Sequence, residues 1–161
     1  MKNIKIEIKW ALIFAAMSLV WMLIEKLAGL HDAHIDKHPI YTNFIAIPAI
    51  AVYVLALNDK RKNFYDGSMS YQQGFISGLI ITLIVTLLSP LTQYITSNII
   101  TPGFFANAIE YAVANGKTSR EAAEAYFSLK NYIVQGLIGA PVMGIVTTAI
   151  VAIFTKKKKK G

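Results

Sequence analysis

The chain has 161 residues, of which 55% are hydrophobic and only 16% are charged, and its formal net charge is +7. This length and composition suit about four membrane spans in one domain and exclude an ordinary soluble protein. The absence of cysteine excludes disulfides and thiolate metal sites. The basic residues flank apolar runs, where they orient membrane spans, and this placement argues against a nucleic-acid partner.

The first apolar run, from Trp10 to Ile24, predicts a membrane span over residues 10–30. Lys2, Lys5 and Lys9 precede it, as they would precede the apolar part of a secretory signal peptide. No small-x-small cleavage site follows, so a retained span is the better interpretation.

The second apolar run predicts a span over residues 41–57, after a short polar loop from His31 to Pro39. Seventeen residues are close to the lower limit for crossing a bilayer, and Pro48 lies inside the run. This span is therefore the least strongly indicated of the four.

The third predicted span, residues 71–97, lies in a segment (67–109) without any Asp, Glu, Lys, Arg or His. Ser70 and Gln73 have the spacing of a capping box at its start. From Tyr71 to Ser89 an α-helix would rise about 28 Å, close to the thickness of the hydrocarbon core. Pro90 should free the carbonyl of Thr86 and kink the helix.

An outer helical excursion is expected over residues 102–131. Six apolar residues after Pro102 recur as on one face of an amphipathic helix at the membrane surface: Phe104, Phe105, Ala108, Ile109, Ala112 and Val113. Thr118 and Glu121 have the spacing of a second capping box, and the helix that they open could continue unbroken into the fourth span, residues 132–154.

The distribution of Lys and Arg predicts which side of the membrane each loop faces. If the N-terminus is cytoplasmic, eleven of the 16 cationic residues lie on the inner side. This asymmetry follows the positive-inside rule and predicts that both termini are cytoplasmic.

Small residues predict how two of the spans pack, because helices approach closely in lipid only where side chains are small. The third and fourth spans each carry a stripe at four-residue spacing, Gly74, Gly78, Thr82 and Thr86 in one, and Gly136, Ala140, Gly144 and Thr148 in the other. In an antiparallel pair we expect Gly74 level with Thr148 and Thr86 level with Gly136. The stripes could instead be incidental, or could pack against a second copy of the chain.

Glu25 is the only acid expected within a span. It lies about one and a half turns from the outer end of the first span, and an ionisable residue at this depth is costly. Its side chain could reach the headgroups or form a structural pair, or it could line a binding cavity. Three prolines would kink the outer parts of the spans: Pro48, Pro90 and Pro141. We therefore consider a polar outer vestibule lined by Glu25, Ser89, Gln93 and Gln135. The alternative is that neighbouring side chains and waters bind the carbonyls freed at the kinks and that no cavity forms.

All three histidines, His31, His34 and His38, lie in the loop after the first span. His34 and His38 are four residues apart and would share a helix face, as metal ligands often do. The simpler interpretation is that these imidazoles are solvated residues near the headgroups, and no metal or other cofactor is expected.

Several segments together resemble a family of small bacterial membrane proteins catalogued only as a domain of unknown function. They are the turn and helix start at 63–75 (NFYDGSMSYQQGF), the sequence ITPGF at 100–104, and GKTSRE at 116–121 before a Gly-rich last span ending in lysines. The resemblance implies four spans, a helical outer excursion, and location in the bacterial inner membrane. It implies no activity.

The sequence thus predicts an all-α protein, a four-helix transmembrane bundle with two short extramembrane helices between spans three and four. Nucleophile elbows, phosphate-binding glycine loops and HExxH are missing from it, so an enzyme is not expected. The leading hypothesis is a non-enzymatic accessory or scaffold protein that binds membrane lipid, a membrane-protein partner or a second copy of itself. The alternative is a small channel or carrier with an outward-facing polar vestibule.

Overall fold

The structure, a computed structural model that describes residues 4–157, is helical almost throughout. Four helices in this range are long and apolar enough to cross a membrane: Lys5–Leu27, His38–Asn63, Tyr71–Ile100 and Leu129–Thr155. Within the described residues strand-type pairing is limited to one bridge between Met69 and Lys157. The prediction of an all-α, four-span membrane protein is confirmed. Lys2 and Lys158 to Lys160, which contributed to the predicted sidedness, lie outside the described residues.

Seven α-helices occur among the described residues, in the order α1 (Lys5–Leu27), α2 (His38–Tyr41), α3 (Ala46–Asn63), α4 (Tyr71–Ile95), α5 (Phe104–Ala114), α6 (Arg120–Tyr126) and α7 (Leu129–Thr155). A 3-10 turn (Thr42–Ile45) joins α2 to α3, and a π-helical turn (Thr96–Ile100) extends α4. The second span is therefore a composite of three helical segments.

Most span ends lie beyond their predicted bounds, but the first span ends at Leu27 rather than at residue 30. The first begins at Lys5 rather than residue 10, and the second runs over residues 38–63 rather than 41–57. Apolar runs underestimate these helices because their end turns carry polar side chains that have partners inside the protein. Pro48 lies in the first turn of α3, where the 3-10 turn ends, and so interrupts no long α-helix.

The helix caps agree with the sequence at one place and differ at another. Ser70 and Gln73 form the predicted capping box, with backbone-to-side-chain hydrogen bonds of 3.2 and 2.8 Å. The predicted box at Thr118 is wrong, because Ser119 is the N-cap of α6 and accepts a hydrogen bond from Ala122 N. α6 ends at Tyr126 and Ser128 caps α7, so the excursion does not continue unbroken into the fourth span.

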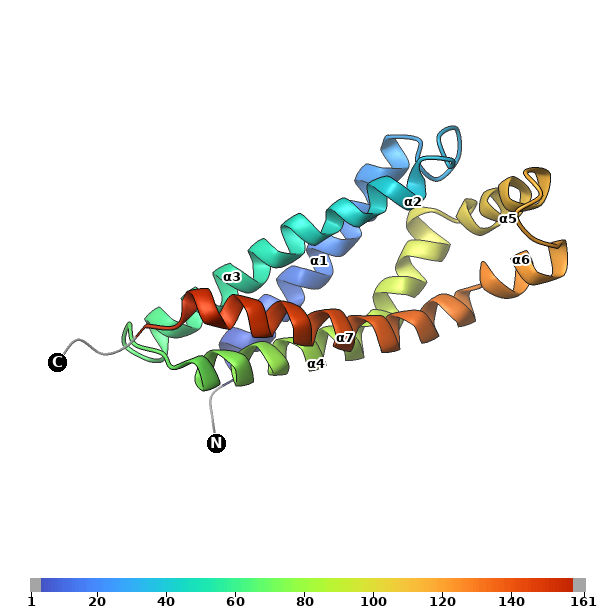
Figure 1. Ribbon diagram of the computed structural model, residues 1–161. Coiled ribbons are helices and arrows are strands. Elements are labelled where there is room, and N and C mark those ends of the chain that lie inside the picture. The colour runs from blue at the N-terminus through green and yellow to red at the C-terminus, as the bar shows by residue number, and fades with distance from the viewer. Residues whose placement is uncertain (1–3, 158–161) are drawn as a thin grey trace.

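α4 packs most extensively on α7, and α1 packs on both α4 and α3. Toward one end of the bundle the pair α1 and α3 diverges from the pair α4 and α7 (Figure 1). We call the end with the start of α1, the end of α7 and the turn at residues 64–70 the terminal end. The opposite end, with residues 28–37, α2, α5 and α6, is the loop end. The two ends of the described chain lie at the same end of the bundle (Figure 1).

The last part of α4 leaves α7 and turns toward α1 at the loop end (Figure 1). Pro90 lies in this part of the helix. Proline removes one backbone donor, and the Thr86 carbonyl that it frees accepts a hydrogen bond from the Ser89 hydroxyl at 2.8 Å. The bend therefore needs no water to satisfy that carbonyl.

The tightly packed core lies in the terminal half of the bundle. It consists of Ala11, Tyr53, Ala56, Leu57, Met69, Ile81, Val151 and Ala152. Beyond this core the two helix pairs separate, and the cavities described below lie in that part of the bundle.

Candidate functional site

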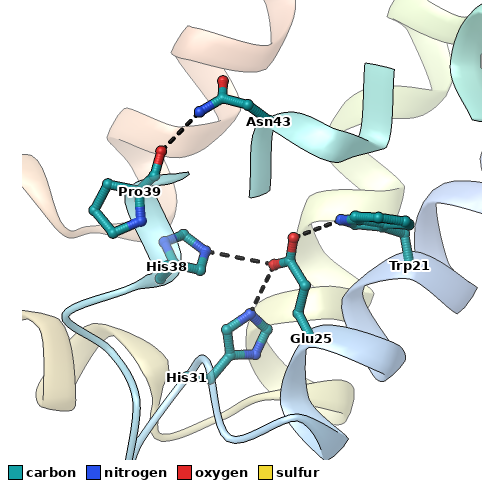
Figure 2. Close-up of polar contacts among 6 residues, drawn as sticks. All are labelled: Trp21, Glu25, His31, His38, Pro39 and Asn43. Carbon is teal, nitrogen blue, oxygen red and sulfur yellow. Dashed lines mark hydrogen bonds and ion pairs between the residues drawn. The ribbon is translucent and has the colours of Figure 1, made fainter. Parts of the chain in front are cut away.

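Glu25 on α1 is the centre of a buried polar cluster at the loop end (Figure 2). Its side chain is only 1% exposed. Trp21, one turn earlier on the same helix, donates its indole N–H to Glu25 Oε1 at 2.5 Å. The Nε2 atoms of His31 and His38 lie 3.1 and 3.5 Å from the other carboxylate oxygen, Oε2.

The loop after α1 brings the two imidazoles back over Glu25. Gly29 has φ +75°, a left-handed conformation that glycine adopts without steric cost, and it reverses the chain direction directly after α1. Backbone hydrogen bonds from Leu30 N to Glu25 O and from His34 N to Gly29 O close the loop. Because α2 begins at His38, the second imidazole is held by a helix rather than by the loop.

α5 covers the cluster from the other side. The Phe104 ring lies 5.1 Å from the His31 ring and 4.9 Å from the His38 ring, measured between centroids. Asn107 on the same helix donates a hydrogen bond to the His31 carbonyl at 2.9 Å. His34, which the sequence paired with His38, is exposed and lies outside the cluster. The pair that converges is His31 with His38.

A cavity of about 180 Å³ lies beside the imidazoles. Its lining comes from all four spans and from α5: Met22, His31, His38, Thr42, Gln93, Thr96, Ser97, Thr101, Phe104 and Tyr132. Of the residues proposed for a vestibule, Gln93 lines this cavity and Glu25 lies behind the imidazoles. Gln135 is exposed on α7, and Ser89 lies against Gly136, so these two are elsewhere.

The two small-residue stripes face each other, one helical turn away from the predicted register. Thr148 packs on Gly78 and Thr82 packs on Gly144, where the expected partners were Gly74 and Ala140. The observed register places a threonine side chain opposite Gly78 and another opposite Gly144, whereas the predicted one would place Gly78 opposite Gly144 and leave a void. Close packing therefore favours the observed register. Ala140 instead lines a lateral groove.

A second buried polar cluster lies at the terminal end and was missed in the sequence. Glu7, 1% exposed, forms an ion pair with Lys60 at 2.9 Å and accepts a hydrogen bond from Ser77 at 2.7 Å. Burial and the Glu7 charge raise the pKa of the neighbouring Tyr65 phenol. Glu25 is therefore not the only acid within a span. Glu7 lies shortly before the first apolar run. It was missed because the predicted span began at Trp10 and so left Glu7 outside the membrane.

A family model described as Protein of unknown function (DUF4199) matches residues 9–157. The chain belongs to this family. No curated protein and no solved structure matches the chain. The match covers all three residues of the Glu25 cluster in this DUF4199 protein and begins two residues after Glu7.

Membership in the DUF4199 family agrees with the resemblance found in the sequence and supplies no activity. The family match and the four apolar helices together identify the chain as a multi-pass membrane protein. The DUF4199 protein therefore has two buried acidic centres, one at each end of its bundle, with the tight core and the lateral groove between them.

Proposed function

We propose that this DUF4199 protein is a non-enzymatic membrane protein that binds an acyl chain of a membrane lipid in a groove between α3 and α7. The observation that carries the proposal is a cavity of about 410 Å³ between the two diverging helix pairs. Its lining is Phe14, Thr42, Asn43, Ile45, Ala46, Ala49, Ile50, Tyr53, Val85, Ala140, Met143, Gly144 and Thr147. This volume is within the range of about 300–1,000 Å³ found for ligand sites.

The chemistry of the groove favours a hydrocarbon chain. Ile50 of α3 and Met143 of α7 are exposed at its rim, so it opens toward the surrounding lipid. At its base the Tyr53 hydroxyl is hydrogen-bonded to Thr82 at 2.7 Å and leaves the aromatic ring as the contact surface. An apolar cavity stays free of water, and dispersion contacts are gained when a flexible chain fills it.

Two polar residues of the groove, Thr42 and Asn43, lie together at one end of it, and Thr147 of α7 lies farther along. Thr42 and Asn43 lie in the 3-10 turn at the loop end, where a headgroup would meet the membrane surface. The remaining lining is almost wholly apolar, which matches the division of a phospholipid into a polar head and an apolar chain. A partner helix or a second copy of the chain would not need this division.

The experiment fills the groove and measures lipid retention. The full chain, purified in mild detergent, is analysed by native mass spectrometry for bound phospholipid. Ala49→Phe places a ring in the groove, and Ala16→Phe places the same ring on an exposed position of α1 outside it. Retained lipid should fall severalfold in Ala49→Phe and stay unchanged in Ala16→Phe. Equal retention in both variants, or a change of oligomeric state in Ala49→Phe instead of lipid loss, would overturn the proposal.

We also propose that the protein lies in the bacterial inner membrane with its loop end outward. Eleven of the 16 Lys and Arg residues belong to sequence segments predicted to be cytoplasmic, and the seven of these that the structure describes lie toward the terminal end. The positive-inside rule supports a cytoplasmic location for that end. The lipid groove would accordingly have its polar rim in the outer leaflet.

A channel or carrier is the alternative proposal, favoured by the cavity beside His31 and His38. Toward the terminal end from that cavity, Ile81 and Thr148 have no exposed surface, so a conducting path would require the core to open. Solute flux into proteoliposomes that responds to Glu25→Ala would support this alternative over lipid binding.

A further inference from the structure

The three polar side chains at the loop end present their ligand atoms to one point. Glu25 Oε2, His31 Nε2 and His38 Nε2 all lie within 4.8 Å of one another. In a tetrahedral zinc site with bonds of about 2.0–2.1 Å, neighbouring ligand atoms are about 3.3 Å apart. The distances from Glu25 Oε2 to the two imidazole nitrogens, 3.1 and 3.5 Å, are close to that separation.

The surroundings hold these atoms in place without a ligand. Trp21 binds the far carboxylate oxygen, Oε1, and so leaves Oε2 directed at the imidazoles (Figure 2). Glu25, His31 and His38 are 1%, 4% and 19% exposed, and Phe104 packs on both rings. Side chains fixed in this way lose little further entropy on binding an ion, and outer partners such as Trp21 orient the ligand.

The donor set indicates the class of ion. Two imidazoles and one carboxylate suit Zn²⁺ and neighbouring first-row divalent ions, whereas Mg²⁺ and Ca²⁺ prefer oxygen ligands alone. The chain has no cysteine, so soft thiolate coordination is excluded.

The fourth coordination position has room for a small ligand. Both imidazoles line the cavity of about 180 Å³, whose other polar lining includes Thr42, Gln93 and Thr96. A metal with three protein ligands keeps one position open for water or another small molecule. This cavity could contain that molecule and supply hydrogen bonds to it.

We propose that Glu25, His31 and His38 form a binding site for a divalent transition-metal ion of the zinc class at the loop end of the bundle. The site joins α1 to α2 through one ion, and α5 closes over it. It is independent of the lipid groove, which none of its three ligands lines.

The test measures Zn²⁺ binding to the full chain in detergent, purified with a tag that contains no histidine and stripped with a chelator. Isothermal titration calorimetry should give one Zn²⁺ per chain. Absorption spectra with Co²⁺ should show the strong visible bands of a tetrahedral site. Zn²⁺ should also raise the melting temperature, because an ion that binds only the folded state stabilises it.

Variants separate this site from accidental binding to surface imidazoles. Glu25→Gln, His31→Ala and His38→Ala should each weaken Zn²⁺ binding by about 100-fold or more, and Trp21→Phe by about tenfold, as for outer-shell partners. His34→Ala is the matched control, since His34 lies in the same loop and is exposed. Its Zn²⁺ affinity should stay within about twofold of that of the original protein.

Three results would overturn the proposal: no stoichiometric Zn²⁺ binding, equal loss in His34→Ala, or binding unchanged in a His31→Ala, His38→Ala double variant. If Glu25→Gln fails to fold, His38→Ala decides the question, because its side chain is partly exposed and its removal leaves Trp21 and Glu25 in contact. Loss of Zn²⁺ binding with lipid retention intact would show that the two sites are separate.

Discussion

The side chain of Thr148 occupies the space that any side chain on Gly78 would need. A Cβ built on Gly78 would lie 2.3 Å from Thr148 Cγ2 and 2.6 Å from Thr148 Oγ1. The same relationship recurs one turn away between Thr82 and Gly144, at 2.4 and 2.5 Å. Two reciprocal contacts of this kind fix the register of α4 on α7.

Gly78→Ala should lower the free energy of unfolding by about 1–3 kcal/mol, the cost of an extra methyl group in a closely packed interface. The backbone would have to move, because the obstructing atoms are near the backbone of Thr148. Gly139→Ala is the control, since no described atom other than its chain neighbours and the backbone of its own helix lies within 4 Å of its Cβ position. Unfolding in mixed detergent micelles measures both variants. Equal stability of the two would contradict the proposed packing.

Thr148→Val and Thr82→Val should have opposite effects. Thr148 Oγ1 is buried and has no hydrogen-bond partner among the described residues, so valine removes an unsatisfied hydroxyl at constant shape. Its stability should stay equal or rise by about 1 kcal/mol. Thr82 Oγ1 donates to Gly78 O and pairs with the Tyr53 hydroxyl. Its valine variant should lose about 1–3 kcal/mol, because Tyr53 loses its partner. Unfolding experiments measure both variants. A larger loss of stability in Thr148→Val than in Thr82→Val would be inconsistent with these hydrogen bonds.

Glu7→Ala should destabilise the protein by about 3 kcal/mol, because it removes one partner of a buried ion pair with Lys60. A Glu7→Met, Lys60→Met double variant should recover most of this loss, since both charges are then absent. The control is Lys62→Met, at an exposed position two residues after Lys60 on α3. It should change the free energy of unfolding by less than about 0.5 kcal/mol. A double-mutant cycle on unfolding free energies measures the coupling, and no coupling between Glu7 and Lys60 would refute the pair.

Labelling of single cysteines can test the proposed sidedness, because the chain has no native cysteine. Asn115→Cys is exposed after α5 at the loop end, and Asn63→Cys is exposed at the terminal end of α3. In intact cells a membrane-impermeant maleimide should label only Asn115→Cys, and Asn63→Cys should react after permeabilisation. The opposite pattern would reverse the orientation, and labelling of both in intact cells would contradict the four-span arrangement.

Features that depend on neighbours in the sequence were predicted well. The capping box at Ser70 follows from residues three apart, and the amphipathic helix α5 from spacing along one face. The freed carbonyl at Thr86 follows from Pro90 alone, but its partner, the Ser89 hydroxyl, was not identified beforehand. Local stereochemistry decides features of this type.

The candidate site was only half visible in the sequence. Glu25 and the histidines were treated as unrelated. His34 was paired with His38 because residues four apart share one face of a helix, and a helix was expected in the loop. The left-handed Gly29 instead reverses the chain so that His31 faces Glu25. The α4–α7 register was likewise not predictable from the sequence. Both stripes repeat every four residues, so a shift by one helical turn aligns them again.

The sequence by itself determined that the chain crosses a membrane as four helices, because apolar runs of bilayer length must satisfy their backbone hydrogen bonds internally. Only the tertiary structure decided which polar side chains meet: Glu7 with Lys60 at one end, and Glu25 with His31 and His38 at the other. Hydropathy records the cost of burying each charge separately, whereas compensation of that cost depends on a partner that only the folded chain brings near.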